Sequence, residues 1–345
     1  MEMDERKIRI LQAIINDYIN TAEPVGSRTI AKKYDLGISS ATIRNEMADL
    51  EEMGYIEQLH CSSGRKPSDK GYRLYVDKLM KIPNLSPEEE LIIKNKLLDV
   101  ALCEVDKVIK QATHLLSELT NLTCIVKAPS ANKSCLKSIQ LIGIDNSNIL
   151  AVVVTDSGII KNSIIRIKRP VGIDVLVRLS NILNARLKNL TLEEINLPII
   201  NSLKNDLVGY EEIFDAIIPV LNEVLSGEDS KEVYLEGTTN IFNYPEYNNI
   251  DKAKEFLTLL YDKDVINNLI NTSDTISVSI GEENFMPGAK ECSIISAVYS
   301  IGGRPLGTIG VIGPTRMPYS KIISVLSKIV NEIDHNIARG YLDDR

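Results

Sequence analysis

The sequence predicts an α+β protein of several domains that begins with a winged helix-turn-helix. Three observations support this fold class. The 345 residues exceed what one hydrophobic core usually serves, so we expect two or three domains. Residues 1–75 combine three amphipathic helical segments with a short hairpin pattern. Beyond them, strand-like runs stop, give way to a mostly helical block and then resume, which indicates one domain inserted into another.

The first three predicted helices form the head of the protein. Apolar residues recur at helical spacing over 4–20, and a shorter helix is expected over 27–34. The third helix begins at Ser39 or Ser40, since a serine hydroxyl there accepts a hydrogen bond from a backbone N–H of the first turn. Gly54 ends it, because glycine is favoured just past the end of a helix. The apolar stripe of this helix turns four polar side chains toward another surface: Thr42, Arg44, Asn45 and Asp49.

A hairpin follows the third helix. Tyr55 and Ile56 start its first strand, and a polar, basic tip is expected over 62–67. The second strand must be brief, because residues 70–72 already lead into another amphipathic run. A helix followed by such a hairpin is the outline of a winged helix. That arrangement places the helix in the major groove of DNA and the hairpin against the phosphates.

Arg44 and Asn45 are the candidates for base reading within this head. Arginine recognises guanine and asparagine recognises adenine, each through a pair of hydrogen bonds in the major groove. The alternative is that one of them pairs with Glu46, with Asp49 or with a phosphate. We expect at least one of the two to contact a base.

Phosphate contacts are expected around the same helix. Ser39, Ser40 and Thr42 lie at its N-terminus, where hydroxyl and backbone N–H groups bind phosphate, although the serines could serve only as caps. Arg65 is expected at the hairpin tip, where an exposed cation has little packing to do. Arg28, near the start of the second helix, could also reach the DNA backbone.

The remainder of the chain alternates between sheet and helix. One long helix or two consecutive helices are expected over 88–120, with further helices over 174–187 and 321–339. Strands are predicted at 122–127, 136–144, 149–155, 159–167, 275–280, 293–299 and 306–312. Short turns join the second, third and fourth of these strands into an antiparallel meander.

Four segments follow from this pattern. Residues 1–82 are the DNA-binding head, and 83–189 contain a linker helix and the first part of an α/β domain. Residues 190–274 are the inserted helical block, and 275–345 complete the α/β domain. Prolines mark a hinge over 82–87, so the orientation of the head relative to the rest of the chain need not be fixed.

Composition excludes several classes of protein. The net charge is −8, but residues 1–80 hold 12 basic and 13 acidic residues, so most of the excess acid lies outside the head. No apolar run reaches the roughly 20 residues of a membrane helix, and the N-terminus lacks an apolar signal core, so we expect a cytoplasmic protein. Five scattered cysteines and three isolated histidines indicate reduced thiols and no metal site. Without a catalytic constellation or nucleotide-binding motif, we expect neither an enzyme nor a cofactor.

Four segments closely resemble the HrcA family of heat-inducible transcription repressors: SSATIRNEMADLEEMGYI at 39–56, SSGRKPSDKGYRLYVD at 62–77, IGEEN at 280–284 and GTIGVIGPTRMPYS at 307–320. The resemblance extends over effectively the whole chain. It implies a winged-helix head, a GAF-like α/β domain and a mostly helical dimerisation domain inserted in it. Lys66 stands where the resemblance leads us to expect an apolar residue, and it adds a candidate phosphate contact.

The same resemblance implies a function. A homodimer would bind double-stranded DNA at an inverted repeat called CIRCE and repress chaperone operons of the heat-shock response. The chaperonin GroEL would be the partner that keeps the repressor active. The alternative is a winged-helix regulator whose GAF-like domain senses a small metabolite, which rests on analogy between folds. Binding to a CIRCE-type repeat and to a scrambled repeat separates the two.

Overall fold

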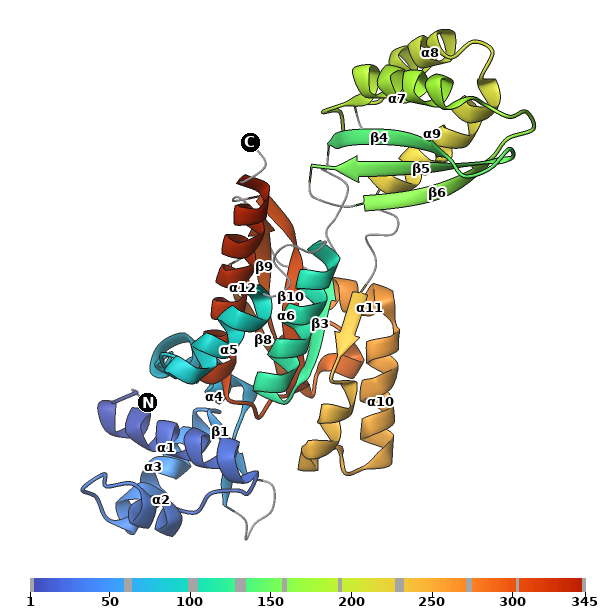
Figure 1. Ribbon diagram of the computed structural model, residues 1–345. Helices are drawn as coiled ribbons and strands as arrows, with labels where there is room; N and C mark the ends of the chain where they lie inside the picture. Colours follow the sequence, from blue (N-terminus) through green and yellow to red (C-terminus); the bar gives the residue numbers. More distant parts are fainter. Residues whose placement is uncertain are drawn as a thin grey trace.

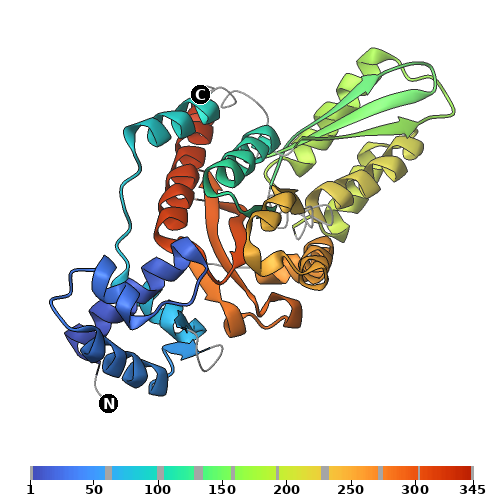
Figure 2. The same cartoon turned by 90° about the horizontal axis from the view of Figure 1, so that it is seen from below.

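The computed structural model describes residues 3–58, 64–98, 105–127, 135–156, 160–191, 194–226, 233–270, 275–301 and 304–342. The chain forms a winged-helix head, a central α/β domain and a separate insert (Figure 1). Seen from below, the head and the insert lie at opposite ends of the central domain (Figure 2).

The head contains the three helices and the short hairpin that the sequence predicts. Its elements are α1 (Glu5–Thr21), α2 (Ser27–Lys33), α3 (Ser40–Glu52), β1 (Ile56–Gln58) and β2 (Arg65–Pro67). The hairpin is antiparallel, and the other side of β2 is bound by Val25, which exchanges two backbone hydrogen bonds of 2.8 and 2.9 Å with Arg65. Gly64 fits there because a Cβ atom at this position would lie 2.5 Å from the carbonyl oxygen of Pro24. The predicted tip over 62–67 begins among residues 59–63, outside the described residues.

The central domain is built on one antiparallel sheet. Its strands are, in spatial order, β7 (Val233–Glu236), β3 (Thr123–Lys127), β10 (Arg304–Pro314), β9 (Cys292–Ile301) and β8 (Ser277–Ile280). Alternate side chains of these strands enter two different cores, because successive residues of a strand point to opposite faces. Cys124 and Val311 belong to one core, whereas Ile125 and Ile312 belong to the other.

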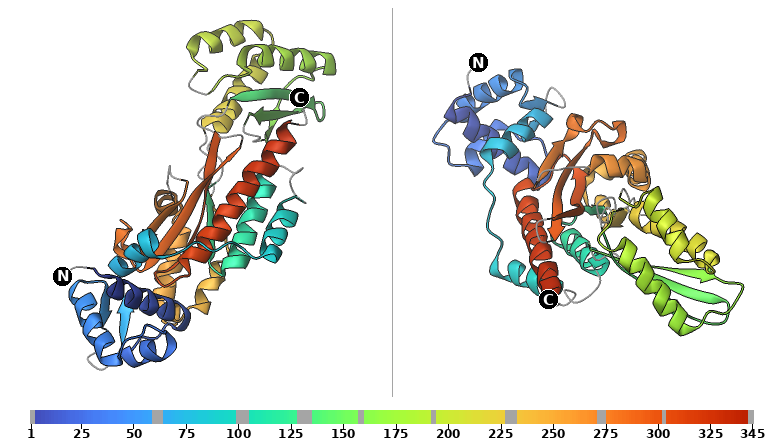
Figure 3. Two further views of the ribbon diagram at one scale, coloured as in Figure 1. Left: turned by 90° about the vertical axis from the view of Figure 1, so that its left-hand side faces the viewer. Right: turned by 90° about the horizontal axis from the view of Figure 1, so that it is seen from above.

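Helices cover both faces of this sheet. One face is covered by α5 (Pro87–Leu98), α6 (Val105–Thr120) and α12 (Tyr319–Leu342), which run side by side in Figure 3. The other face is covered by α10 (Ile250–Tyr261) and α11 (Lys263–Leu269). The region predicted as one or two helices over 88–120 therefore contains two, and residues 99–104 between them lie outside the described part of the chain.

The insert is a three-stranded antiparallel sheet with three helices. Its elements are β4 (Leu136–Gly143), β5 (Asn148–Thr155), β6 (Ile160–Arg166), α7 (Ile173–Leu187), α8 (Leu197–Asp206) and α9 (Glu211–Ser226). Its buried residues form a cluster of their own, which runs from Leu136 to Leu221. The predicted antiparallel meander is confirmed, since β4 pairs with β5 and β5 with β6.

Strand pairing corrects the predicted segment boundaries at 189 and 274. The meander was assigned to the α/β domain within 83–189, but it belongs to the insert. Conversely, the predicted insert over 190–274 contains β7, which pairs with β3 of the central sheet. Hydropathy periodicity identifies a strand but not its partner. The pattern alone therefore does not tell whether a strand belongs to the insert or to the central sheet.

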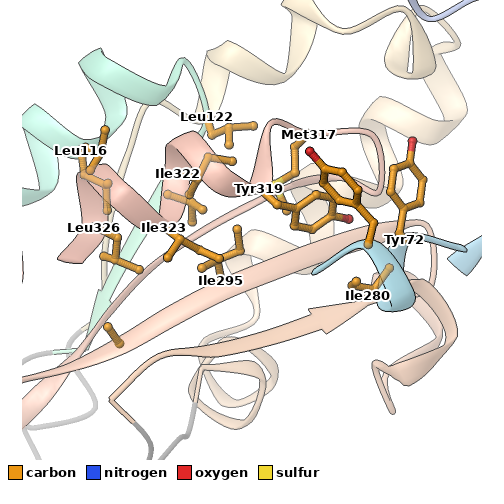
Figure 4. Close-up of a cluster of buried hydrophobic side chains, with 14 of the residues drawn as sticks. Tyr72, Leu116, Leu122, Ile280, Ile295, Met317, Tyr319, Ile322, Ile323 and Leu326 are labelled. Atoms are coloured by element: carbon orange, nitrogen blue, oxygen red, sulfur yellow. The ribbon is translucent and has the colours of Figure 1, made fainter. Parts of the chain in front are cut away.

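The head is packed against the central domain, so the orientation that the sequence leaves open is fixed in this structure. Helix α4 (Asp69–Leu74) of the head carries Tyr72, whose ring centroid lies 5.7 Å from that of Tyr319. Both rings are buried beside Met317 and Ile280 (Figure 4). One continuous hydrophobic cluster extends from the head helices to α12 and includes Leu85 of the linker. Apolar burial on both sides of the proline-marked segment therefore fixes the head.

Polar contacts between the head and the central domain reinforce this packing. The Arg73 guanidinium donates to Glu283 Oε1 at 2.7 Å and to the carbonyl oxygen of Val278 at 2.7 Å. The backbone N–H of Glu282 donates to Asp69 Oδ2 at 3.0 Å. Burial raises the pKa of the Asp69 carboxyl.

Candidate nucleic-acid interface

Helix α3 is capped as the sequence predicts. Ser39 is the N-cap residue, and its hydroxyl accepts a hydrogen bond of 3.1 Å from the backbone N–H of Thr42. The Thr42 hydroxyl lies 2.9 Å from the same oxygen. Ser40 is the first helical residue. The helix ends before Gly54, whose φ of +77° is one that glycine adopts readily.

The inner face of α3 is apolar and the outer face is polar. Three residues of the helix are buried in the core of the head: Ile43, Met47 and Leu50. Arg44 and Asn45 are exposed. Among the described residues, neither side chain forms a hydrogen bond or an ion pair. Both are therefore free to meet a ligand, and the predicted alternative in which one of them pairs with Glu46 or Asp49 is not what the structure shows.

Glu46 and Asp49 pair instead with the start of α1. The Nζ atom of Lys7 lies 2.8 Å from Glu46 Oε2 and 3.1 Å from Asp49 Oδ2. Arg6 Nη1 lies 3.3 Å from the other oxygen of Glu46. Contacts with Glu46 and then Asp49 raise the pKa of the Lys7 ammonium. Lys7 was not among the residues predicted from the sequence. It stands three residues before Ile10, on the buried stripe of α1, and a lysine at such a position is a signal by which it could have been identified.

The basic residues of the hairpin are also paired. Arg65 lies within strand β2 rather than at an exposed tip, and only 21% of its side chain is exposed. Its guanidinium contacts Glu51 Oε2 at 2.8 and 2.9 Å. Lys66 Nζ lies 2.7 Å from Glu57 Oε1 on the neighbouring strand. The expectation that Arg65 has little packing to do is therefore wrong, because strand pairing places it beside α3.

The structure thus brings six of the eight sequence-predicted residues to α3 or its flank, whereas Lys66 pairs with Glu57 of β1. Arg28 is exposed in α2 and, among the described residues, makes no hydrogen bond or ion pair. Like Arg28, Arg44 and Asn45 of α3 have no internal partner among the described residues. The cations of the hairpin are engaged by acids of the head itself.

Comparisons with known proteins agree over nearly the whole chain. Residues 2–78 match the model of the winged helix-turn-helix transcription repressor HrcA DNA-binding domain, and residues 106–323 match that of the HrcA protein C-terminal domain. The heat-inducible transcription repressor HrcA of Clostridium acetobutylicum is 62% identical, covering 98% of each chain. That of Ruminiclostridium cellulolyticum is 47% identical, covering 98% of this chain and 99% of the relative.

A solved structure has the same fold. The crystal structure of a hypothetical protein superposes with a TM-score of 0.67 at 23% identity, covering 98% of this chain and all of that one. Across the part of the chain that the structure describes, no helix has the length and apolarity needed to cross a membrane.

Proposed function

The chain belongs to the HrcA family of heat-inducible transcription repressors, and from this premise we propose that it represses chaperone operons by binding a CIRCE-type inverted repeat as a homodimer. It would act in the cytoplasm, as a DNA-binding regulator and not as an enzyme. The proposal also takes the central domain to be GAF-like. The proposed DNA binding is supported by one observation above all: Arg44 and Asn45 on α3 are exposed and have no partner among the described residues.

Helix α3 supplies both kinds of contact that a reading helix needs. Arg44 and Asn45 carry the donors that recognise guanine and adenine edges. Ser39, Ser40 and Thr42 lie at the N-terminus of the helix, where the macrodipole and backbone N–H groups favour a phosphate. We assign base reading to the first group and positioning on the backbone to the second.

A gel-shift assay tests this assignment at the level of the whole protein. The chain should retain a duplex with a CIRCE-type inverted repeat and should release a scrambled duplex of equal length and composition. Specific binders typically favour their site by a factor on the order of 10³ or more. Equal retention of both duplexes would refute sequence-specific repression.

The insert offers a surface for the homodimer. Register places Ile142 and Ile164 on either side of Leu150, and Ile160 beside Val154, on one face of the three-stranded sheet. Helix α9 packs on the other face, behind the strands in Figure 1. The outer face thus exposes apolar side chains to solvent, and Ile164 is 62% exposed. Such patches mark interaction sites, and a self-complementary patch generates the two-fold axis that an inverted repeat requires.

Light scattering of two matched variants tests this interface. Ile164→Lys adds a charge to the outer face and should give a monomer. Ile250→Lys adds the same charge to an isoleucine of α10, in the central domain, that is 82% exposed, and should leave the dimer intact. If each of the two single variants is still a dimer, the interface lies elsewhere.

We further propose that GroEL increases the fraction of repressor able to bind DNA. The central sheet is split, since β3 pairs with β7 and β10 only after the insert has been synthesised. Closing so long a loop tends to slow folding and to expose apolar surface meanwhile. Heat-damaged proteins that occupy the chaperonin would then reduce repression.

Purified GroEL with its nucleotide, added to dilute repressor, tests this dependence. The measured quantity is the fraction of chains active on operator DNA, which should rise. An active fraction near one that is unchanged by the chaperonin would refute the idea. A small metabolite that changes the fraction instead would favour the ligand-sensing alternative.

A further inference from the structure

Helix α3 has the wrong charge for a helix that enters DNA. Within Ser40–Glu52 it carries one arginine against four acids, a net charge of −3: Glu46, Asp49, Glu51 and Glu52. DNA phosphates repel such a helix, and the repulsion is strongest in the specific complex, where the helix lies deepest in the groove. The head must therefore neutralise α3 from within.

Three cations from outside α3 perform this neutralisation. Lys7 contacts Glu46 and Asp49, and Arg6 contacts the second oxygen of Glu46. Arg65 of the hairpin contacts Glu51. Lys7 is the central member, because its buried ammonium pairs with two of the four acids at once.

The position of Asp49 makes Lys7 the most consequential of these cations. Asp49 follows Asn45 by one helical turn, and residues four apart are neighbours on a helix surface. Without a partner on α1, its carboxylate could turn toward the Asn45 amide and occupy the donors meant for a base. With Lys7 in place, Asp49 is held toward α1, and Asn45 remains free.

We propose that Lys7 is a positioning residue for DNA reading: it holds Glu46 and Asp49 away from the outer face of α3 and offsets part of their charge. This role rests on the proposed function of α3 as the reading helix. Lys7 does not touch DNA in this account. It acts through the two acids. Arg65 offsets the charge of Glu51 from the hairpin and stays a predicted phosphate contact as well.

Binding titrations with the inverted repeat and the scrambled duplex test the role. Lys7→Met keeps most of the side-chain stem and removes the charge, and it should reduce the ratio of the two affinities roughly tenfold, comparable to the loss of one base contact. Lys7→Arg should preserve the ratio. The triple variant Lys7→Met, Glu46→Gln, Asp49→Asn removes the acids as well and should restore it.

Lys33→Met is the matched control. Lys33 pairs with the buried Asp17 of α1. Its loss therefore also leaves an acid of the head without its ion-pair partner, but the acids of α3 stay paired. It should lower thermal stability without changing the affinity ratio. A folded Lys7→Met with an unchanged ratio, or a folded triple variant that fails to regain it, would overturn the positioning role. A wild-type chain that does not distinguish the two duplexes would instead refute the proposed function.

Discussion

The head shares its hydrophobic core with the central domain, whereas the insert has a core of its own. In the head, Tyr72 is buried against Tyr319 of α12, so part of the head's apolar surface is covered only while the two domains are in contact. In the insert, the buried residues of the sheet and of α7 to α9 form one separate cluster. The difference implies that the head unfolds or detaches together with the central domain, while the insert folds and associates independently.

The largest expected effect is on the shared core. Tyr72→Ala should lower the free energy of unfolding by about 3–5 kcal/mol, as is usual when a large buried ring is truncated. Denaturant unfolding followed by circular dichroism should show this loss in the transition that the head shares with the central domain. Tyr72→Phe is the control: among the described residues the buried Tyr72 hydroxyl has no hydrogen-bond partner, so its removal should cost almost nothing. If the head unfolded in a separate, earlier transition, it would not depend on the core that it shares with the central domain.

A somewhat smaller effect is expected in the core of the insert. Leu183 is fully buried in its cluster, so Leu183→Ala should cost about 2–5 kcal/mol. The loss should be confined to the insert. Hydrogen exchange measured by mass spectrometry should show faster exchange in β4 to β6 and unchanged exchange in α1 to α3. Equal acceleration in the head would mean that the insert is not an independent unit.

The smallest expected effect concerns the hairpin cations. Arg65 and Lys66 stay predicted phosphate contacts, but each is already paired with an acid, and partly exposed ion pairs contribute only about 0–1 kcal/mol to stability. Arg65→Ala should therefore leave stability nearly unchanged. If Arg65 exchanges Glu51 for a phosphate, the variant should weaken binding to operator and scrambled DNA alike and lower the salt slope by about one unit per half-site. An unchanged slope would mean that Arg65 serves only to neutralise α3.

Local features of the head could be predicted from the sequence, because short-range chemistry determines them. The Ser39 cap, the buried stripe of α3 and the end at Gly54 all depend on residues within one or two turns. The pairing of Arg65 with Glu51 and of Lys7 with Asp49 could not, since each joins different elements. The same limit explains the misplaced insert boundaries, because the sequence identifies β3 and β4 as strands but not the strands with which they pair.

The docking of the head was missed for a related reason. Pro83 and Pro87 correctly indicate that the helical chain is interrupted there, since residues 80–86 lie outside helices. The prolines do not indicate whether the surfaces on either side of them pack together. The contact of Arg73 with Glu283 joins residues about 200 positions apart, which no local pattern reveals.

We propose that the outer face of α3 reads bases while the rest of the head holds this helix in place. Binding titrations of Arg44→Ala, on the inverted repeat and on the scrambled duplex at several salt concentrations, test it most directly. We predict a loss of about 1–3 kcal/mol per half-site on the repeat, relaxed preference at one base pair and little change on scrambled DNA. Equal weakening on both duplexes, with a reduced salt slope, would show that Arg44 contacts the backbone and would contradict the claim.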